Sequence, residues 1–317
     1  MTVVWVIGSN GLLGSALKRA LNFREIGLFN PTERFHWDSE AELTVQLKSA
    51  VKEFASLVGR DNKWQIYWAA GVGTMSSTET ELATETQTLS TMLNLVESEP
   101  NLILGEGCFA FSSSAGAIYA GSDDDIISEH TLVAPTTAYA KEKLKQERLI
   151  SAFALNDGDG KVAVLLARIS TLYGSGQAIG KQQGLIAHIA RCILRGQSIN
   201  IYVPFDTIRD YITADDAATE IVTTLFAISG KLGVSIKIIA SEKPTTIAEI
   251  ISVFRRISRQ RLRIVSSASK LSNIYNHRIQ FKSMTIPVNG PASRTSLLIG
   301  ISQVIAAERL AFTRSCR

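Results

Sequence analysis

Tyr139 and Lys143 stand four residues apart in the stretch TTAYAKEKLKQERL (136–149), which has the composition of a helix. Residues four apart share one helix face, so this spacing predicts that the amine lies close to the phenol. A phenol of pKa near 10 is a weak base at neutral pH, and lowering that pKa by about three units takes roughly 4 kcal/mol of preferential stabilisation of the phenolate. Because the spacing is common in helices, it supports proton transfer only together with further partners. Lys141 and Lys145 are expected on other helix faces, in solvent.

Three serines, Ser112, Ser113 and Ser114, end the apolar run GCFAFSSS (107–114). This run is typical of a buried parallel strand, and ligands of open α/β sheets lie beyond the carboxyl ends of such strands. We therefore expect one of these three hydroxyls, the last of which lies twenty-five residues before Tyr139, to donate a hydrogen bond to the reacting oxygen. The others would lie nearer a cofactor, and capping of the strand end is the alternative role.

Gly8, Gly11 and Gly14 are spaced G-x-x-G-x-x-G between an apolar run and a helical pattern, the context of a dinucleotide fingerprint. Gly8 would permit a tight turn, Gly11 the approach of a pyrophosphate, and Gly14 close packing of helix on strand. Phosphates would bind at the helix N-terminus, where free N–H groups and the dipole favour anions. A simple tight turn is the alternative, and the strand-turn-helix context favours nucleotide binding.

The choice between NAD and NADP stays open from the sequence. An acidic residue about 20 positions after the glycine loop normally binds the ribose of NAD. In EIGLFNPTERFHWDS the expected strand ends at Asn30, with no acid in that place and Arg34 close behind. Arg34 could meet the 2′-phosphate of NADP or be an exposed loop cation, and Asp38 is expected beside the adenine.

These side chains must be held by alternating strands and helices, as the hydrophobic periodicity indicates. The predicted strands are 3–8, 64–71, 107–114, 161–170, 199–204, 209–213 and 234–241. The predicted helices are 12–22, 85–98, 139–155, 184–196 and 214–229. The alternation predicts an α/β Rossmann fold, a doubly wound parallel sheet with a smaller C-terminal α/β substrate domain.

A chain of 317 residues exceeds the usual size of one core, so we expect two closely joined domains. The dinucleotide-binding domain is expected at 1–170, with 214–242 returning to it. The substrate-binding domain is expected at 171–213 and 243–317. The last forty residues carry no clear pattern.

Composition narrows the class of protein. Apolar residues make up 45% and charged residues 20%, which is typical of a globular protein, and the net charge of +4 forms no long basic run. Nucleic acid is therefore not an expected partner. The three cysteines and four histidines are scattered, so we expect neither a disulfide framework nor a metal site. The N-terminal apolar run is expected to be a strand rather than a signal peptide, and a cytoplasmic location without a membrane anchor is predicted.

In this order along the chain, the glycine loop, WAAG (68–71), SSSAGAIYAG (112–121), PTTAYAKEK (135–143), RISTLYGSGQ (168–177) and RDYITADDAA (209–218) resemble the extended short-chain dehydrogenase/reductases. That family includes NAD-dependent nucleotide-sugar epimerases and dehydratases. The resemblance covers most of the chain. It implies NAD or NADP as the cofactor, a nucleotide-sugar substrate, and a homodimer formed through the helix carrying Tyr139 and Lys143 and the helix before it.

The resemblance also implies roles for individual residues. Ser114, Tyr139 and Lys143 would be catalytic, with Lys143 also holding the nicotinamide ribose. The cofactor would contact Gly8, Asn10, Gly11, Leu12, Gly14, Asp38, Ala69, Ala70, Gly71, Ser112, Tyr139 and Lys143. The substrate would contact Ser114, Thr171, Arg209 and Arg278.

Several substrate-side positions depart from the family pattern. Glu85, Thr171 and Gly184 each stand where the family often has an asparagine. Arg209 matches an arginine that meets the substrate diphosphate, a task that suits a bidentate guanidinium, although a salt bridge with Asp210 or Asp215 is the alternative. Arg278 is a weaker candidate for a second phosphate contact. Tyr173 is expected to support its loop, and Asp215 and Asp216 to begin a helix.

Ala115 and Gly116 replace the Asp-Glu pair with which the 4,6-dehydratases of the family eliminate water, so dehydration is disfavoured. Epimerisation through a transient keto sugar is narrowly favoured over NADPH-dependent reduction of a 4-keto sugar. In an epimerase Tyr139 would remove a hydroxyl proton, and in a reductase it would donate one. A non-catalytic NAD(P)-sensing regulator is a further alternative, disfavoured because the chain keeps both Tyr139 and Lys143.

Overall fold

The structure is a computed structural model. It describes residues 1–24, 26–60, 62–75, 77–155, 162–176, 184–266, 278–287 and 294–315.

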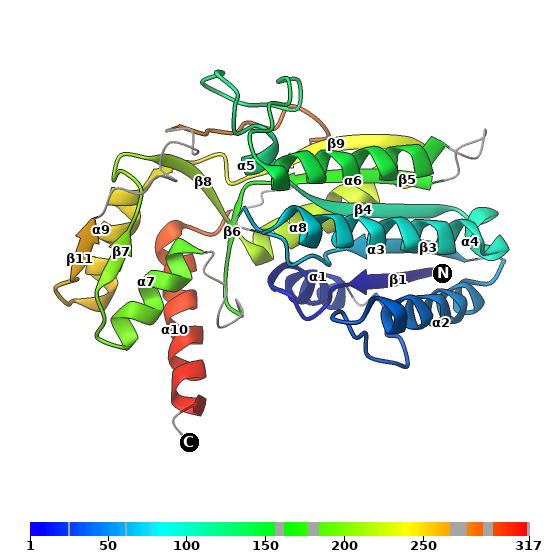
Figure 1. The fold of residues 1–317 in the computed structure, drawn as a ribbon, viewed down its shortest axis with the longest axis horizontal. Coiled ribbons are helices and arrows are strands. Elements are labelled where there is room, and N and C mark those ends of the chain that lie inside the picture. Colours follow the sequence, from blue (N-terminus) through cyan, green and yellow to red (C-terminus); the bar gives the residue numbers. More distant parts are fainter. Residues whose placement is uncertain are drawn as a thin grey trace.

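Six parallel strands form the central sheet, in the order β2-β1-β3-β4-β5-β9 (Figure 1). Their bounds are Thr2–Ile7 for β1, Leu28–Phe29 for β2, Lys63–Trp68 for β3, Gly107–Ser114 for β4, Val162–Ile169 for β5 and Gly233–Ile239 for β9. β2 and β3 flank β1 on opposite sides, so the strand order reverses at β1. Ligands of open α/β sheets bind at such a switch point, outside the carboxyl ends of the strands.

Alternating side chains of β1 show why both faces of the sheet need a cover. Val4 and Val6 belong to one apolar core, whereas Val3, Trp5 and Ile7 belong to another on the opposite face. All five side chains are buried. A strand that is apolar on both faces is stable only between two layers of helices.

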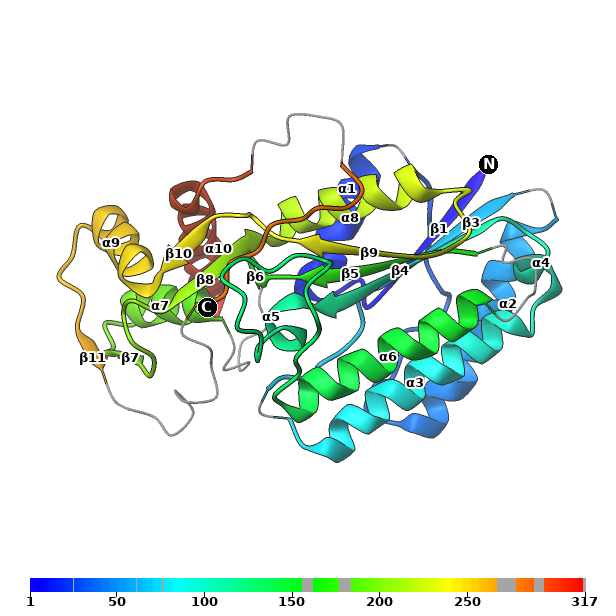
Figure 2. The same cartoon turned by 90° about the horizontal axis from the view of Figure 1, so that it is seen from above.

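Two helices cover one face of the sheet, and three cover the other (Figure 2). The first layer consists of α1 (Leu12–Phe23) and α8 (Ala214–Ile228), and the second of α2 (Glu40–Val58), α3 (Glu79–Glu97) and α6 (Ala138–Leu155). The short helices α4 (Pro100–Ile103) and α5 (Ala115–Ile118) flank β4 in the chain. This arrangement confirms the predicted doubly wound Rossmann fold.

The remaining elements lie at one end of the sheet and have a core of their own (Figure 1). The strands are β6 (Thr171–Tyr173), β8 (Ile208–Thr213) and β10 (Pro244–Thr246) in one small sheet, and β7 (Ile199–Ile201) and β11 (Ile264–Ser266) in another. The helices are α7 (Leu185–Leu194), α9 (Ile247–Ser258) and α10 (Leu297–Ser315). α8 and β9 lie with the central sheet, and the division at 1–170 with 214–242 and at 171–213 with 243–317 stays a proposal.

The two helices expected to form the dimer, α3 and α6, bury apolar side chains inside the protomer. Leu89, Met92 and Leu93 of α3 and Ile150 and Phe153 of α6 are all buried in the core beneath the sheet. The homodimer therefore stays a prediction that rests on the resemblance alone.

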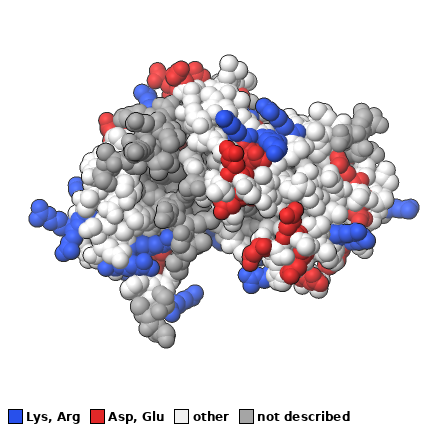
Figure 3. Space-filling model, in the orientation of Figure 1, with Lys and Arg blue, Asp and Glu red and all other residues white. Residues whose placement is uncertain are grey.

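Charged side chains are spread over the surface. On the face shown in Figure 3, lysine and arginine side chains alternate with acidic groups and form no continuous basic surface. Among the residues that the structure describes, no helix combines the length and the apolar character needed to cross a membrane.

Candidate active site

At the end of β4 the side chains of the three serines point to two different faces of the sheet. Successive residues of a strand point to opposite faces, so Ser112 and Ser114 share one face and Ser113 faces the other. Ser113 is buried, and its hydroxyl donates to Glu147 Oε1 at 2.7 Å. Of the two serines expected near the cofactor, Ser112 is therefore the better candidate, because Ser113 is used inside the protein.

Tyr139 lies in the first turn of α6, which Thr137 caps by accepting a hydrogen bond from the Ala140 N–H at 3.2 Å. The Ser114 side chain lies close enough to the Tyr139 phenol to act on its pKa. The pKa of Tyr139 is raised to about 12, mainly by burial and also by the negative charge of Glu85, while Ser114 opposes both effects. Without a bound cation Tyr139 is therefore a protonated phenol at neutral pH.

Lys143 lies one turn further along α6 and is buried, with 7% of its surface exposed. Its ammonium group lies 5.8 Å from the Tyr139 ring centroid and 5.1 Å from that of Phe111. It donates to Gln146 Oε1 at 3.0 Å, and Gln146 donates in turn to Thr86 Oγ1 on α3 at 3.0 Å. Burial lowers the pKa of Lys143, and the carboxylates of Glu85 and Glu147 oppose that effect. The structure thus brings Ser114, Tyr139 and Lys143 together.

Glu85 is the unexpected member of this cluster. Its carboxylate is half-buried on α3, and Oε1 accepts hydrogen bonds from the N–H of Val72, at 2.5 Å, and from that of Gly73. The sequence marks Glu85 only as a departure from an asparagine. The structure places its charge close enough to Tyr139 and Lys143 to raise the pKa of both.

The glycine loop joins β1 to α1 so closely that side chains do not fit. Gly8 has φ +82°, and a Cβ there would lie 2.5 Å from the Ala70 nitrogen and 2.7 Å from the Ala69 oxygen. A Cβ on Gly14 would lie 2.7 Å from the carbonyl carbon of Gly8. Gly11 closes the turn by donating its N–H to the Gly8 oxygen at 3.0 Å. Gly8 and Gly14 are thus required by the backbone geometry of this turn, whereas a Cβ on Gly11 would lie 3.3 Å from the Gly8 oxygen.

This loop fits the phosphates of a dinucleotide. Gly11 is the N-cap of α1 and supplies no capping side chain, and the first turn of α1 carries no acidic residue. Its N–H groups and dipole are therefore available to an anion. Asn10 and Leu12 flank Gly11, while Ala69, Ala70 and Gly71 follow β3, the neighbour of β1 in the sheet.

The segment after β2 would face the adenosine part of such a cofactor. The strand ends at Phe29, one residue before the predicted end at Asn30, and the Asn30 side chain donates to the Leu28 oxygen at 3.4 Å. Arg34 and Asp38 are both exposed in the loop that follows. No acidic residue stands at the strand end, so the geometry leaves Arg34 available for a 2′-phosphate.

A buried ion pair joins β5 to α6, the helix that carries Tyr139 and Lys143. Arg168 on β5 donates Nε and Nη2 to Glu147 of α6 at 3.0 and 2.7 Å, and donates Nη1 to the Tyr119 hydroxyl at 2.5 Å. All three side chains are buried. This pair was not predicted from the sequence, although Glu147, four residues after Lys143, shares its helix face.

The substrate-side candidates lie on the small sheet of β6, β8 and β10. Thr171 pairs with Tyr211, and Arg209 pairs with Thr245. Arg278 is exposed, its backbone pairs with that of Ile208, and its guanidinium lies 3.9 Å from Asp125. Arg209 and Arg278 therefore stand on neighbouring extended segments.

The two proposed salt-bridge partners of Arg209 have other contacts. Asp210 is buried and accepts hydrogen bonds from Ser170 at 2.6 Å and from Ser241 at 2.8 and 2.9 Å. Asp215 forms an ion pair with Arg19 at 2.6 Å. Arg209 itself donates to the Ile208 oxygen at 2.7 Å.

Three further residues have structural roles. Gly184 is the N-cap of α7 with φ +107°, a conformation that disfavours a side chain such as asparagine. Tyr173 is buried against α10, where a Cβ on Gly300 would lie 2.9 Å from its ring. Asp216 lies in the first turn of α8, as expected, and accepts two hydrogen bonds from Thr295.

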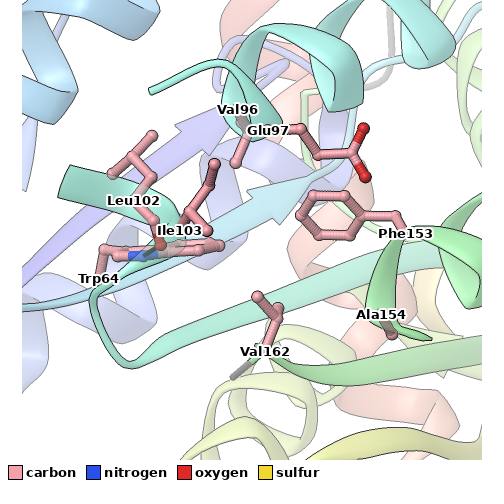
Figure 4. Close-up of a pocket in the computed structure, with 8 residues that line it drawn as sticks. All are labelled: Trp64, Val96, Glu97, Leu102, Ile103, Phe153, Ala154 and Val162. Carbon is pink, nitrogen blue, oxygen red and sulfur yellow. Dashed lines mark hydrogen bonds between the residues drawn. The ribbon is translucent and has the colours of Figure 1, made fainter. Parts of the chain in front are cut away.

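A hollow at the amino ends of the strands is distinct from this site, which lies at their carboxyl ends (Figure 4). It is lined by Trp64, Val96, Glu97, Leu102, Ile103, Phe153, Ala154 and Val162. Trp64 and Val162 stand at the amino ends of β3 and β5, away from the serines. Within the described part of the chain, no three His, Cys, Asp or Glu side chains cluster as metal ligands.

The model of the NAD-dependent epimerase/dehydratase family matches residues 4–233, more than two thirds of the chain. The chain belongs to the NAD-dependent epimerase/dehydratase family. This confirms the resemblance drawn from the glycine loop, the Ser-Tyr-Lys residues and the motifs after them.

Two curated relatives of this family member are enzymes of sugar nucleotides. The dTDP-4-dehydro-6-deoxyglucose reductase of Escherichia coli is 29% identical over 228 residues, which are 67% of this chain and 69% of the relative. The dTDP-L-rhamnose 4-epimerase of Burkholderia thailandensis is 30% identical over 99 residues, 31% of this chain and 26% of the relative.

Solved structures match this family member along its whole length. MoeE5 in complex with UDP-glucose and NAD has a TM-score of 0.76 at 20% identity, covering 98% of this chain and 100% of that one. RMD from Pseudomonas aeruginosa complexed with NADPH has a TM-score of 0.77 at 19% identity, covering 97% and 99%. These likenesses establish the shared fold.

Proposed function

We propose that this family member reduces the keto group of a nucleotide-linked 4-keto sugar, with a nicotinamide dinucleotide as hydride donor and Tyr139 as proton donor. The observation that carries the proposal is the Tyr139 phenol, which lies beside Ser114 and is kept protonated by burial and by the charge of Glu85. A protonated phenol is ready to donate a proton, whereas removal of one requires the phenolate.

In this mechanism Ser114 and Tyr139 both hydrogen-bond to the keto oxygen of the sugar. A dinucleotide bound at the glycine loop would supply the hydride that reaches the keto carbon. As the carbon–oxygen double bond becomes single, the oxygen takes the Tyr139 proton, and the product is an alcohol. The phenolate that remains regains its proton from solvent, and Lys143 stabilises it meanwhile.

Binding is proposed to divide between the two parts of the chain. The dinucleotide phosphates would lie at the N-terminus of α1, with Arg34 and Asp38 near its adenosine and Lys143 at its nicotinamide ribose. Ser112 would lie on the cofactor side of Ser114. Arg209 and Arg278 would hold the substrate diphosphate beside Thr171.

The E. coli relative supports the reductive reading, because its name describes a reductase that acts on a dTDP-4-dehydro sugar and the match extends over 67% of this chain. The wider cofactor class, NAD or NADP, is supported by the family and by neighbours solved with NAD and with NADPH.

Epimerisation is the second candidate, and it is the reading that the sequence alone favours. The match to a dTDP-L-rhamnose 4-epimerase supports it. In that reaction Tyr139 must first remove a hydroxyl proton, so the positive ring of the oxidised cofactor would have to lower the pKa of Tyr139 by several units.

Stoichiometry separates the two candidates. The protein is incubated with NADPH or NADH and a dTDP-linked 4-keto sugar, and in parallel with UDP- and dTDP-hexoses without added cofactor. The reductase oxidises one dinucleotide per keto sugar and leaves the hexoses unchanged. Interconversion of a hexose without net cofactor oxidation would instead identify an epimerase, with mass spectrometry of the co-purified dinucleotide as a second readout.

A further inference from the structure

Glu85 stands at the carboxyl end of β3 without being part of the strand. Its Oε1 is held by two backbone N–H groups, those of Val72 and Gly73, which follow the strand end. Gly71, with φ +147°, turns the chain so that a Cβ there would lie 3.3 Å from Glu85 Oε2. The carboxylate is therefore fixed by the turn rather than free to swing into solvent.

The negative charge of the same carboxylate acts on both Tyr139 and Lys143. Its neighbour Thr86 accepts the hydrogen bond of Gln146, which in turn holds the ammonium group of Lys143, so α3 and α6 are joined at this point. Glu85 Oε2 has no hydrogen-bond partner among the residues that the structure describes, whereas Oε1 has two. One oxygen thus anchors the turn while the other leaves a negative charge beside Tyr139 and Lys143.

We propose that the fixed negative charge of Glu85 makes this site bind the oxidised dinucleotide more tightly than the reduced one. The inference rests on the proposed function, which puts the nicotinamide end of the cofactor at Tyr139 and Lys143. The oxidised and reduced forms differ there by one positive charge on the ring. A carboxylate attracts that charge, whereas a neutral amide at the same position would not.

The expected size of the effect follows from the partly buried surroundings of Glu85. Two unit charges several ångströms apart in a partly buried site interact strongly enough to change a binding constant about tenfold. The preference assists the reduction, because it stabilises the cofactor in the form that remains after the hydride has left. Tyr139 is protonated before the reaction and again after it. The site before the reaction and the site after it therefore differ in the charge of the nicotinamide ring.

The test compares Glu85→Gln with the wild type by isothermal titration calorimetry, using NAD⁺, NADH, NADP⁺ and NADPH as probes. Glutamine keeps an oxygen that accepts from Val72 and Gly73, so the turn is retained while the charge is removed. The expected result is a wild-type preference for the oxidised form of the dinucleotide pair that binds. In Glu85→Gln that ratio shifts about tenfold toward the reduced form.

Glu79→Gln is the matched control, because Glu79 is an exposed carboxylate in the first turn of the same helix. It is expected to leave the ratio unchanged. An unchanged ratio in Glu85→Gln, or an equal loss of affinity for both forms, overturns the inference and leaves a role in holding the turn. Failure of the wild type to bind any of the four dinucleotides overturns the proposed function and the inference with it.

Discussion

Ser114 at the end of β4 lies close enough to Tyr139 in the first turn of α6 to act on the pKa of its phenol, although Tyr139 follows twenty-five positions later in the chain. Lys143 and Glu85 add two opposite charges around the same phenol. In the proposed reduction this phenol keeps its proton until it donates it to the keto oxygen of the substrate.

Replacing Glu147 with glutamine is expected to destabilise the fold by about 3 to 5 kcal/mol, because Arg168 would be left buried without its carboxylate. Urea denaturation measures the free energy of unfolding of each variant. Glu142→Gln is the control on the same helix, since it breaks only the pair with exposed Lys145 and should cost less than about 1 kcal/mol. Equal losses of unfolding free energy in the two variants would show that the buried pair stabilises the fold no more than the exposed pair does.

Gly14→Ala is expected to cost about 1 to 3 kcal/mol and to abolish dinucleotide binding, because the added Cβ pushes α1 away from the glycine loop. Thermal unfolding and titration with NADH and NADPH measure the two effects. Gly27→Ala is the control, since a Cβ there meets open space. Tight cofactor binding by Gly14→Ala would contradict the placement of the phosphates at α1.

Lys143→Met is expected to change how stability depends on pH. Burial lowers the pKa of Lys143 in the folded protein below its ordinary value of 10.5, so between the two values the unfolded chain holds a proton that the folded protein has lost. The stability of the wild type should therefore rise relative to Lys143→Met as the pH increases from 7 toward 10.5, by about 1.4 kcal/mol for each unit of lowering.

Urea unfolding at several pH values measures this difference, with Lys145→Met as the exposed control on the same helix. The control should run parallel to the wild type. A parallel course for Lys143→Met as well would mean that the ammonium group is not destabilised by its burial.

The strands of the central sheet were predictable because their hydrophobic runs have no other stable place than between two helical layers. Helices α2, α9 and α10 were not assigned from the sequence. In α2 the buried residues Leu43, Leu47 and Phe54 do follow a helical spacing, and in α9 a capping box joins Thr246 and Glu249, so those signals were present. The mixed pattern of α10 becomes legible only through its packing against α7 and α9.

In the candidate active site, the order of the motifs along the chain was enough to predict that Ser114, Tyr139 and Lys143 lie together. The direction of each serine required the register of β4, which places Ser113 against Glu147. The role of Glu85 depends on how the chain turns at Gly71, and one sequence does not specify that turn. The pair of Glu147 and Arg168 joins two distant elements and is visible only once they pack.

The most direct measurement follows the absorbance of NADPH or NADH on mixing with a dTDP-linked 4-keto sugar, for the wild type and Tyr139→Phe. Exposed Tyr202→Phe serves as the control. The proposed function predicts oxidation of one dinucleotide per sugar by the wild type and by Tyr202→Phe. It predicts a rate at least about a hundredfold lower in Tyr139→Phe, with unchanged cofactor affinity. Equal rates in the wild type and Tyr139→Phe would contradict Tyr139 as the proton donor.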